Sequence, residues 1–158
     1  MPAIHYARRC MRIALSTDLK TPLIDTLCSE IERYGHDVKY VGPEADGAEA
    51  DWPDVTSQAM RLIQTGKSDE AIVCCWTGTG ACIAANKHRG IRAALCTDAE
   101  TARGARVWNV ANVLALSLRL TTDALAKEIL GAWFTATPGD DEWNRSQVAK
   151  ISDLEQEC

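Results

Sequence analysis

Residues 70–76 read E-A-I-V-C-C-W, an almost uninterrupted apolar run, and they are followed by T-G-T-G at 77–80 and A-C-I-A-A-N-K-H-R-G at 81–90. A short run of this kind is typical of a strand buried on both faces of a parallel sheet. The glycines then turn the chain, and residues 81–90 predict a short helix that ends at Gly90. This stretch therefore predicts a strand, a turn and a helix, the unit from which α/β folds are built.

The same alternation continues on both sides of this unit. Apolar runs predict four further strands, at residues 12–16, 37–42, 91–97 and 113–118. Apolar residues at helical spacing predict helices at residues 22–34, 55–66, 98–109, 121–137 and 146–157. Asp98 is the expected N-cap of its helix. Strands that alternate with helices predict a three-layer α/β/α sandwich around a mostly parallel five-stranded sheet.

Composition limits the classes of function. The chain has 158 residues and a net charge of −5, without a Lys/Arg block, which disfavours nucleic-acid binding. No apolar run approaches the roughly 18 residues needed to span a bilayer. Residues 1–10 lack an apolar signal core, so we expect an N-terminal extension and a single domain at 11–158. Seven scattered cysteines fit reduced thiols and a cytoplasmic location better than a disulfide framework.

Four kinds of site fit the T-G-T-G turn poorly. Lys87 is too far from the glycines for a Walker loop, and Ile83 replaces the third glycine of a dinucleotide fingerprint. A zinc site is disfavoured because the chain has no C-x-x-C and no paired His. Cys74 and Cys75 point to opposite faces of a strand, which makes them poor redox partners. Sheets of this class bind ligands beyond the carboxyl ends of their strands, so the turn remains a candidate site.

The remaining interpretation is a base beside an oxyanion site. A strand ends near Cys75, and the backbone N–H groups of the following turn, at a helix N-terminus, are expected to lack hydrogen-bond partners within the helix. Thr77 adds a hydroxyl, and Gly78 and Gly80 let a ligand approach the backbone closely. A base next to an oxyanion site is what proton abstraction beside a carbonyl requires. A cysteine packed in the core and an ordinary Gly/Thr turn would give the same pattern, so spacing alone leaves the function open.

The chain resembles the type B ribose-5-phosphate isomerases and the related galactose-6-phosphate isomerase subunits. Their members carry C-G-T-G-x-G-x-S-I-A-A-N-K-x-x-G-I-R-A-A-L-C, and residues 75–96 here read C-W-T-G-T-G-A-C-I-A-A-N-K-H-R-G-I-R-A-A-L-C. The family elements H-N-x-x-N-V-L, D-Y-P-D and D-H-A-G read W-N-V-A-N-V-L at 108–114, D-W-P-D at 51–54 and D-L-K-T at 18–21. The resemblance extends from about residue 12 to residue 151.

The resemblance implies a flavodoxin-like or Rossmann-like fold without a nucleotide. It also implies interconversion of aldose and ketose phosphates through a cis-enediolate, with no metal or cofactor. Members form dimers or tetramers whose subunits share active sites, so we expect the C-terminal helix to reach a partner subunit. The expected partners are therefore a small sugar or sugar phosphate and further copies of the chain.

The resemblance also implies a role for each matched position. Cys75 would move the proton between C1 and C2, and Thr77 would help to relay protons between the sugar oxygens. The anion hole for the enediolate would be formed by Trp76, Gly78, Thr79 and Gly80. The substrate hydroxyls and phosphate would be bound by Asp18, Asn109 and Arg119.

Several positions depart from the family pattern. Trp108 stands where the family has the histidine thought to open the sugar ring, and Leu19 replaces a histidine near the phosphate. Trp76 replaces a glycine beside the base, and Trp52 replaces a tyrosine near the sugar. The family's tail arginines, in the form R-H-x-x-R, fall on Trp143 and Gln147 here, so only Arg145 could substitute for them, out of register. Ribose 5-phosphate is therefore not the expected substrate.

Three explanations of these departures stay open. The substrate is already open-chain, such as a tetrose phosphate, or it is an unphosphorylated sugar that stacks on the tryptophans. In the third explanation, the chain is one subunit of a mixed pair whose partner supplies the missing groups. A sugar-binding module without catalysis on the same scaffold is the competing class of function.

Overall fold

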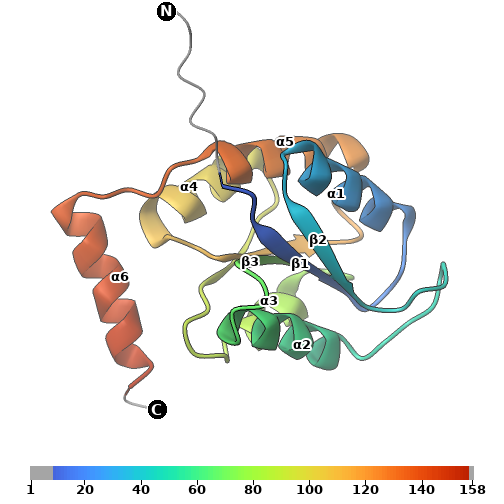
Figure 1. Ribbon diagram of the computed structural model, residues 1–158, viewed down its shortest axis with the longest axis horizontal. Helices are drawn as coiled ribbons and strands as arrows, with labels where there is room; N and C mark the ends of the chain where they lie inside the picture. Colours follow the sequence, from blue (N-terminus) through green and yellow to red (C-terminus); the bar gives the residue numbers. More distant parts are fainter. Residues whose placement is uncertain (1–8, 157–158) are drawn as a thin grey trace, which may run out of the picture.

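The structure is a computed structural model that describes residues 9–156. The predicted N-terminal extension at 1–10 lies outside the described residues, apart from its last two. Within the described part, strands and helices alternate along the chain (Figure 1). In chain order they are β1 (Arg12–Thr17), α1 (Pro22–Arg33), β2 (Asp37–Val41), α2 (Trp52–Gln64), β3 (Glu70–Cys75), α3 (Thr79–Ala85), β4 (Ala93–Leu95), α4 (Ala99–Asn109), β5 (Val113–Ser117), α5 (Asp123–Thr135) and α6 (Glu142–Leu154).

The five strands form one sheet in the order β2-β1-β3-β5-β4, and every pairing between them is parallel. The predicted α/β class and sheet are therefore confirmed. The last two strands are exchanged relative to the flavodoxin order. The chain runs from β1 outward to β2 and then crosses back to β3, so the carboxyl ends of β1 and β3 lie at a topological switch point.

Helices cover both faces of the sheet. Figure 1 shows α1, α4 and α5 on one face and α2 and α3 on the other. Side chains alternate between these two layers along each strand: Ile13 and Leu15 of β1 belong to the first buried cluster, whereas Ala14 belongs to the second. The three-layer sandwich follows from this alternation.

The core also contains a buried ion pair near the amino edge of the sheet. The Trp133 side chain is fully buried and donates its Nε1–H to Glu70 at 3.0 Å. Arg106 pairs with the same carboxylate, with 2.7 Å between Nη1 and Oε1. Burial raises the pKa of Glu70, and the charge of Arg106 opposes that shift. This cluster ties β3, α4 and α5 together.

α6 stands apart from the sandwich, as Figure 1 shows at the left. The turn before it is held by a hydrogen bond from the Gly139 N–H to the Val107 carbonyl at 2.8 Å. At its other end, Glu155 accepts from the Gly90 N–H at 2.9 Å. α6 is therefore tied to the body near both ends, and grooves lie beneath it.

Several elements differ in extent from the sequence prediction: α3 ends at Ala85 and not at Gly90, and α2 begins at Trp52 and not at residue 55. β4 is shorter than residues 91–97 because the Arg92 N–H donates to the Asn112 side chain at 2.8 Å instead of entering a strand ladder. α6 begins earlier than residue 146 because Asp141 acts as its N-cap and accepts from the Asn144 N–H at 2.9 Å. Among residues 9–156, no helix combines the length and apolar character needed to cross a bilayer.

Candidate active site

A small cavity opens at the carboxyl edge of the sheet, where β1 and β3 end. It encloses about 310 Å³ and is lined by Asp18, Leu19, Glu49, Ala50, Trp52 and Trp76. Asp18 directly follows β1 and Trp76 directly follows β3, which places the cavity at the switch point of the sheet. Ligands of open α/β sheets bind at this point. The cavity is therefore the candidate active site.

The two adjacent cysteines separate as their strand alternation requires. Cys74 is completely buried in the layer under α1, α4 and α5, whereas Cys75 faces the layer of α2 and α3. Burial raises the pKa of the Cys74 thiol, and it raises the pKa of Cys96 to about 12. Both thiols therefore stay protonated near neutral pH. Cys75 ends β3 immediately before Trp76, and its Sγ accepts from the Ala81 N–H in the first turn of α3 at 3.5 Å.

The turn after Cys75 has little freedom. Gly78 has φ +75°, and a Cβ there would lie 2.6 Å from Leu95 Cδ1 and 2.8 Å from the backbone carbon of Leu116. The hydroxyls of Thr77 and Thr79 hydrogen-bond to each other at 2.6 Å. Within residues 9–156, the backbone N–H groups of Thr77, Thr79 and Gly80 have no hydrogen-bond partner. The turn thus presents free amide donors near the Cys75 thiol.

Two tryptophans border the turn and the cavity. The Trp52 ring packs against Gly80, where an added Cβ would lie 3.2 Å from Trp52 Cε3. The Trp76 side chain is 59% exposed, but its carbonyl accepts from the Arg119 N–H at 3.1 Å and from the Ser117 hydroxyl at 2.9 Å. Trp76 therefore has a fixed backbone and a ring directed away from the core. Both aromatic surfaces can contact a ligand in the cavity.

Asp18 gives the cavity a polar group. Its Oδ1 atom is buried and lacks a hydrogen-bond partner among the described residues. Burial raises the pKa of Asp18, and the nearby charge of Glu49 adds to that shift. A buried acceptor without a partner carries a desolvation cost unless a donor binds to it. Asp18 can therefore accept a hydrogen bond from a ligand hydroxyl.

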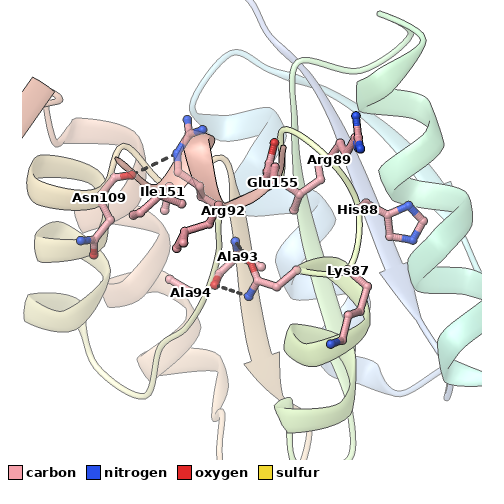
Figure 2. Close-up of a pocket in the computed structure, with 13 residues that line it drawn as sticks. Lys87, His88, Arg89, Arg92, Ala93, Ala94, Asn109, Ile151 and Glu155 are labelled. Atoms are coloured by element: carbon pink, nitrogen blue, oxygen red, sulfur yellow. Dashed lines mark hydrogen bonds between the residues drawn. The ribbon is translucent and has the colours of Figure 1, made fainter. Parts of the chain in front are cut away.

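Other predicted site residues lie on a different part of the chain. Trp108 and Asn109 line a groove of about 620 Å³ together with Trp143 and other residues of α6. A neighbouring groove of about 750 Å³ runs between α6 and residues 86–94. Figure 2 shows this second groove, with Arg92 bonded to the Asn109 carbonyl at 3.1 Å. A single chain therefore does not bring Trp108 and Asn109 into the cavity at Asp18.

The two predicted arginines also differ in position. Arg119 follows β5 at the same sheet edge as the cavity, and its side chain is exposed. Arg145 lies on α6 and pairs with Asp140 at 2.7 Å. The structure therefore places Arg119 beside the turn, and it places Arg145 on the separate helix.

Comparison with known proteins then assigns the chain. The family model described as Ribose/Galactose Isomerase matches residues 13–151. The chain belongs to this family. A D-erythrulose-4-phosphate isomerase of Pectobacterium atrosepticum is 39% identical over 127 residues, which cover 80% of this chain and 84% of that protein. The ribose-5-phosphate isomerase B of Escherichia coli is 42% identical over 86 residues, covering 54% and 58% of the two chains.

Structural comparison gives the same family. The type B ribose 5-phosphate isomerase of Leishmania infantum superposes with a TM-score of 0.88 at 34% identity, covering 94% of this chain and 98% of that one. These matches confirm the predicted resemblance and the prediction of an aldose–ketose isomerase.

The second charged residue of the cavity, Glu49, was missed from the sequence. Glu49 lies in the polar loop between β2 and α2, where nothing in its spacing distinguishes it from Glu44 or Asp46. An isolated bridge between Glu49 and Leu19 brings it to the cavity. The sequence could not place Glu49 at the site, because such long-range pairing is not encoded in local periodicity.

Proposed function

We propose that the chain is an aldose–ketose isomerase of a tetrose phosphate, with Cys75 as the base and a cis-enediolate as the intermediate. The observation that carries the proposal is the Cys75 thiol at the end of β3, next to a turn with free amide groups, while the following residue, Trp76, lines a cavity of about 310 Å³. The relative named D-erythrulose-4-phosphate isomerase supports the choice of a four-carbon substrate.

The proposed reaction moves one proton between neighbouring carbons. The Cys75 thiolate takes a proton from C1 of the ketose, the electron pair forms the C1–C2 double bond, and the C2 oxygen gains the negative charge. The amides of Thr77, Thr79 and Gly80 donate hydrogen bonds to that oxygen. Thr77 relays a proton from O1 to O2, and the thiol returns its proton to C2, which gives the aldose.

A tetrose phosphate explains the departures from the family pattern. Its terminal hydroxyl is phosphorylated and cannot close a furanose ring, so no ring-opening group is needed where Trp108 replaces histidine. Leu19 replaces another family histidine, and its apolar side chain can neither neutralise a phosphate nor donate a hydrogen bond to it, so the phosphate of the substrate would bind elsewhere. Trp52 and Trp76 narrow the cavity, which suits a shorter carbon chain.

We also propose a homodimer or tetramer whose subunits share active sites. Exposed apolar side chains border the grooves beneath α6, among them Trp108, Trp143, Ile151 and Leu154. A partner seated there would bring Asn109 and Trp108 of one subunit toward the cavity of the other. α6 then contributes to the subunit contact. Light scattering of the wild type and of Trp143→Ala tests this, since the variant should shift the equilibrium toward the monomer.

Deuterium exchange tests the reaction and the substrate together. The wild type is incubated in D₂O with D-erythrulose 4-phosphate, ribose 5-phosphate and unphosphorylated erythrulose, and deuterium at C1 and C2 is followed by NMR. We expect exchange with the tetrose phosphate and little with the other two. Efficient exchange with ribose 5-phosphate would refute the substrate assignment. Binding without exchange for every sugar would identify a non-catalytic sugar-binding module instead.

A further inference from the structure

Glu49 is held at the cavity by contacts of its backbone neighbours. Residues 47–50 lie along residues 18–20, with hydrogen bonds from the Gly47 N–H to the Lys20 carbonyl at 2.9 Å, and from the Lys20 N–H to the Ala48 carbonyl at 3.2 Å. The Ala50 N–H donates to the Asp18 carbonyl at 2.7 Å, and Glu49 forms a bridge with Leu19. The position of Glu49 is therefore set by the fold and not by a free loop.

The negative charge at this end of the cavity is not neutralised. Among residues 9–156, Asp18 and Glu49 are the charged residues that line the cavity, and no lysine, arginine or histidine of this range lines it. The nearest cation along the chain, Lys20, is paired with Asp25 at 2.8 Å. Glu49 itself forms no ion pair within residues 9–156. Two carboxylates therefore face the same small volume.

Two facing carboxylates determine which ligand groups can bind next to them. Carboxylate oxygens accept hydrogen bonds from hydroxyls, whereas they repel a phosphate or another carboxylate. We propose that Glu49 is a specificity-determining residue that, with Asp18, makes this end of the cavity accept sugar hydroxyls and reject anionic groups. This role rests on the proposed isomerisation of a sugar phosphate, because it concerns how that substrate lies in the site.

The carboxyl edge of the sheet also carries a positive charge, away from Asp18 and Glu49. Arg119 follows β5, which is separated from β1 by β3 alone, so about 10 Å of sheet lie between the strand ends that carry Asp18 and Arg119. A short sugar phosphate laid across this edge would place hydroxyls at Asp18 and Glu49 and its phosphate toward Arg119. Its reacting carbons would then lie over β3, where Cys75 is found.

Two ligands that differ in the number of their anionic ends test whether the cavity rejects anionic groups, whichever end of the ligand enters it. Erythritol 4-phosphate carries one anionic end, and 4-phosphoerythronate carries an anionic group at both ends. Their dissociation constants are measured by calorimetry for the wild type, for Glu49→Gln and for the control Asp46→Asn, which removes an acid from the same loop outside the cavity.

The proposal predicts opposite changes for the two ligands. Glu49→Gln should bind 4-phosphoerythronate about three- to tenfold more tightly, as expected for removal of one like charge a few ångströms away. It should bind erythritol 4-phosphate slightly less tightly, since a charged acceptor is lost. A merely structural role would weaken both ligands together. Equal changes for the two ligands, or the same result with Asp46→Asn, would overturn the proposal.

The same measurements separate this proposal from the proposed function. Turnover of D-erythrulose 4-phosphate by the wild type reports on the isomerase, and the ratio of the two dissociation constants reports on Glu49. A wild type without turnover but with the predicted change in ratio would refute the reaction and keep the charge selection. Turnover with an unchanged ratio would refute the role of Glu49 alone.

Discussion

Gly78→Ala should destabilise the protein much more than the same substitution at Gly66. Both glycines have a positive φ, +75° and +70°, so alanine costs about 1–2 kcal/mol at either position from backbone strain. At Gly66 no atom of the described residues lies within 4 Å of the added Cβ, whereas at Gly78 the added Cβ would meet the Leu116 backbone at 2.8 Å. That overlap adds about 1–3 kcal/mol, because backbone atoms cannot move aside cheaply.

The comparison isolates the steric contribution. Urea unfolding followed by tryptophan fluorescence gives the free energy of unfolding of each variant, and the difference between Gly78→Ala and Gly66→Ala should be about 1–3 kcal/mol. Turnover should fall by about a hundredfold in Gly78→Ala, since the amides of the turn move relative to the substrate. Equal stabilities for the two variants, or full activity of Gly78→Ala, would refute the view that this turn is tightly fixed.

Three further predictions follow from other contacts. Arg12 lowers the pKa of Asp69 to about 2, so the stability that this pair contributes is present above pH 4 and is lost as the pH falls toward 2. In Asp69→Asn, the free energy of unfolding should therefore depend less on pH in this range. The difference should be less than about 1 kcal/mol, because the pair is partly exposed. Glu70→Gln should cost about 3 kcal/mol in urea unfolding, because it leaves the buried Arg106 without its counter-charge. Trp76→Gly should raise the ratio of kcat/KM for ribose 5-phosphate over erythrulose 4-phosphate by removing a wall of the cavity, and an unchanged ratio would exclude Trp76 from substrate selection.

Much of the fold could be predicted because the core imposes local patterns. The apolar run at 70–75 is fully buried, and Asp98 accepts from the Thr101 N–H as the expected N-cap. Periodicity could not give the exchange of β4 and β5, since the order of strands depends on pairing between distant segments. The early start of α6 was also missed, because the Asp141 cap lies in an acidic loop without a clear helical pattern.

The part of the candidate site that lies at the carboxyl ends of the strands could be predicted from the sequence. Asp18, Trp52 and Trp76 converge on one cavity, as expected for residues at the carboxyl edge of a parallel sheet. The separation of Asn109 from this cavity could not be predicted from the motif, because a motif records the spacing of residues in the sequence and not the distance between their side chains in the fold. Glu49 required the tertiary contact between its loop and Leu19.

The most direct test of the central claim compares the two adjacent cysteines. Cys75→Ala and Cys74→Ala are assayed for deuterium exchange into D-erythrulose 4-phosphate in D₂O, and circular dichroism confirms that each variant is folded. The account predicts that Cys75→Ala loses at least about a thousandfold in exchange rate, since the base is gone, while Cys74→Ala keeps turnover because its thiol is buried in the opposite layer. Near-wild-type exchange by a folded Cys75→Ala would contradict it.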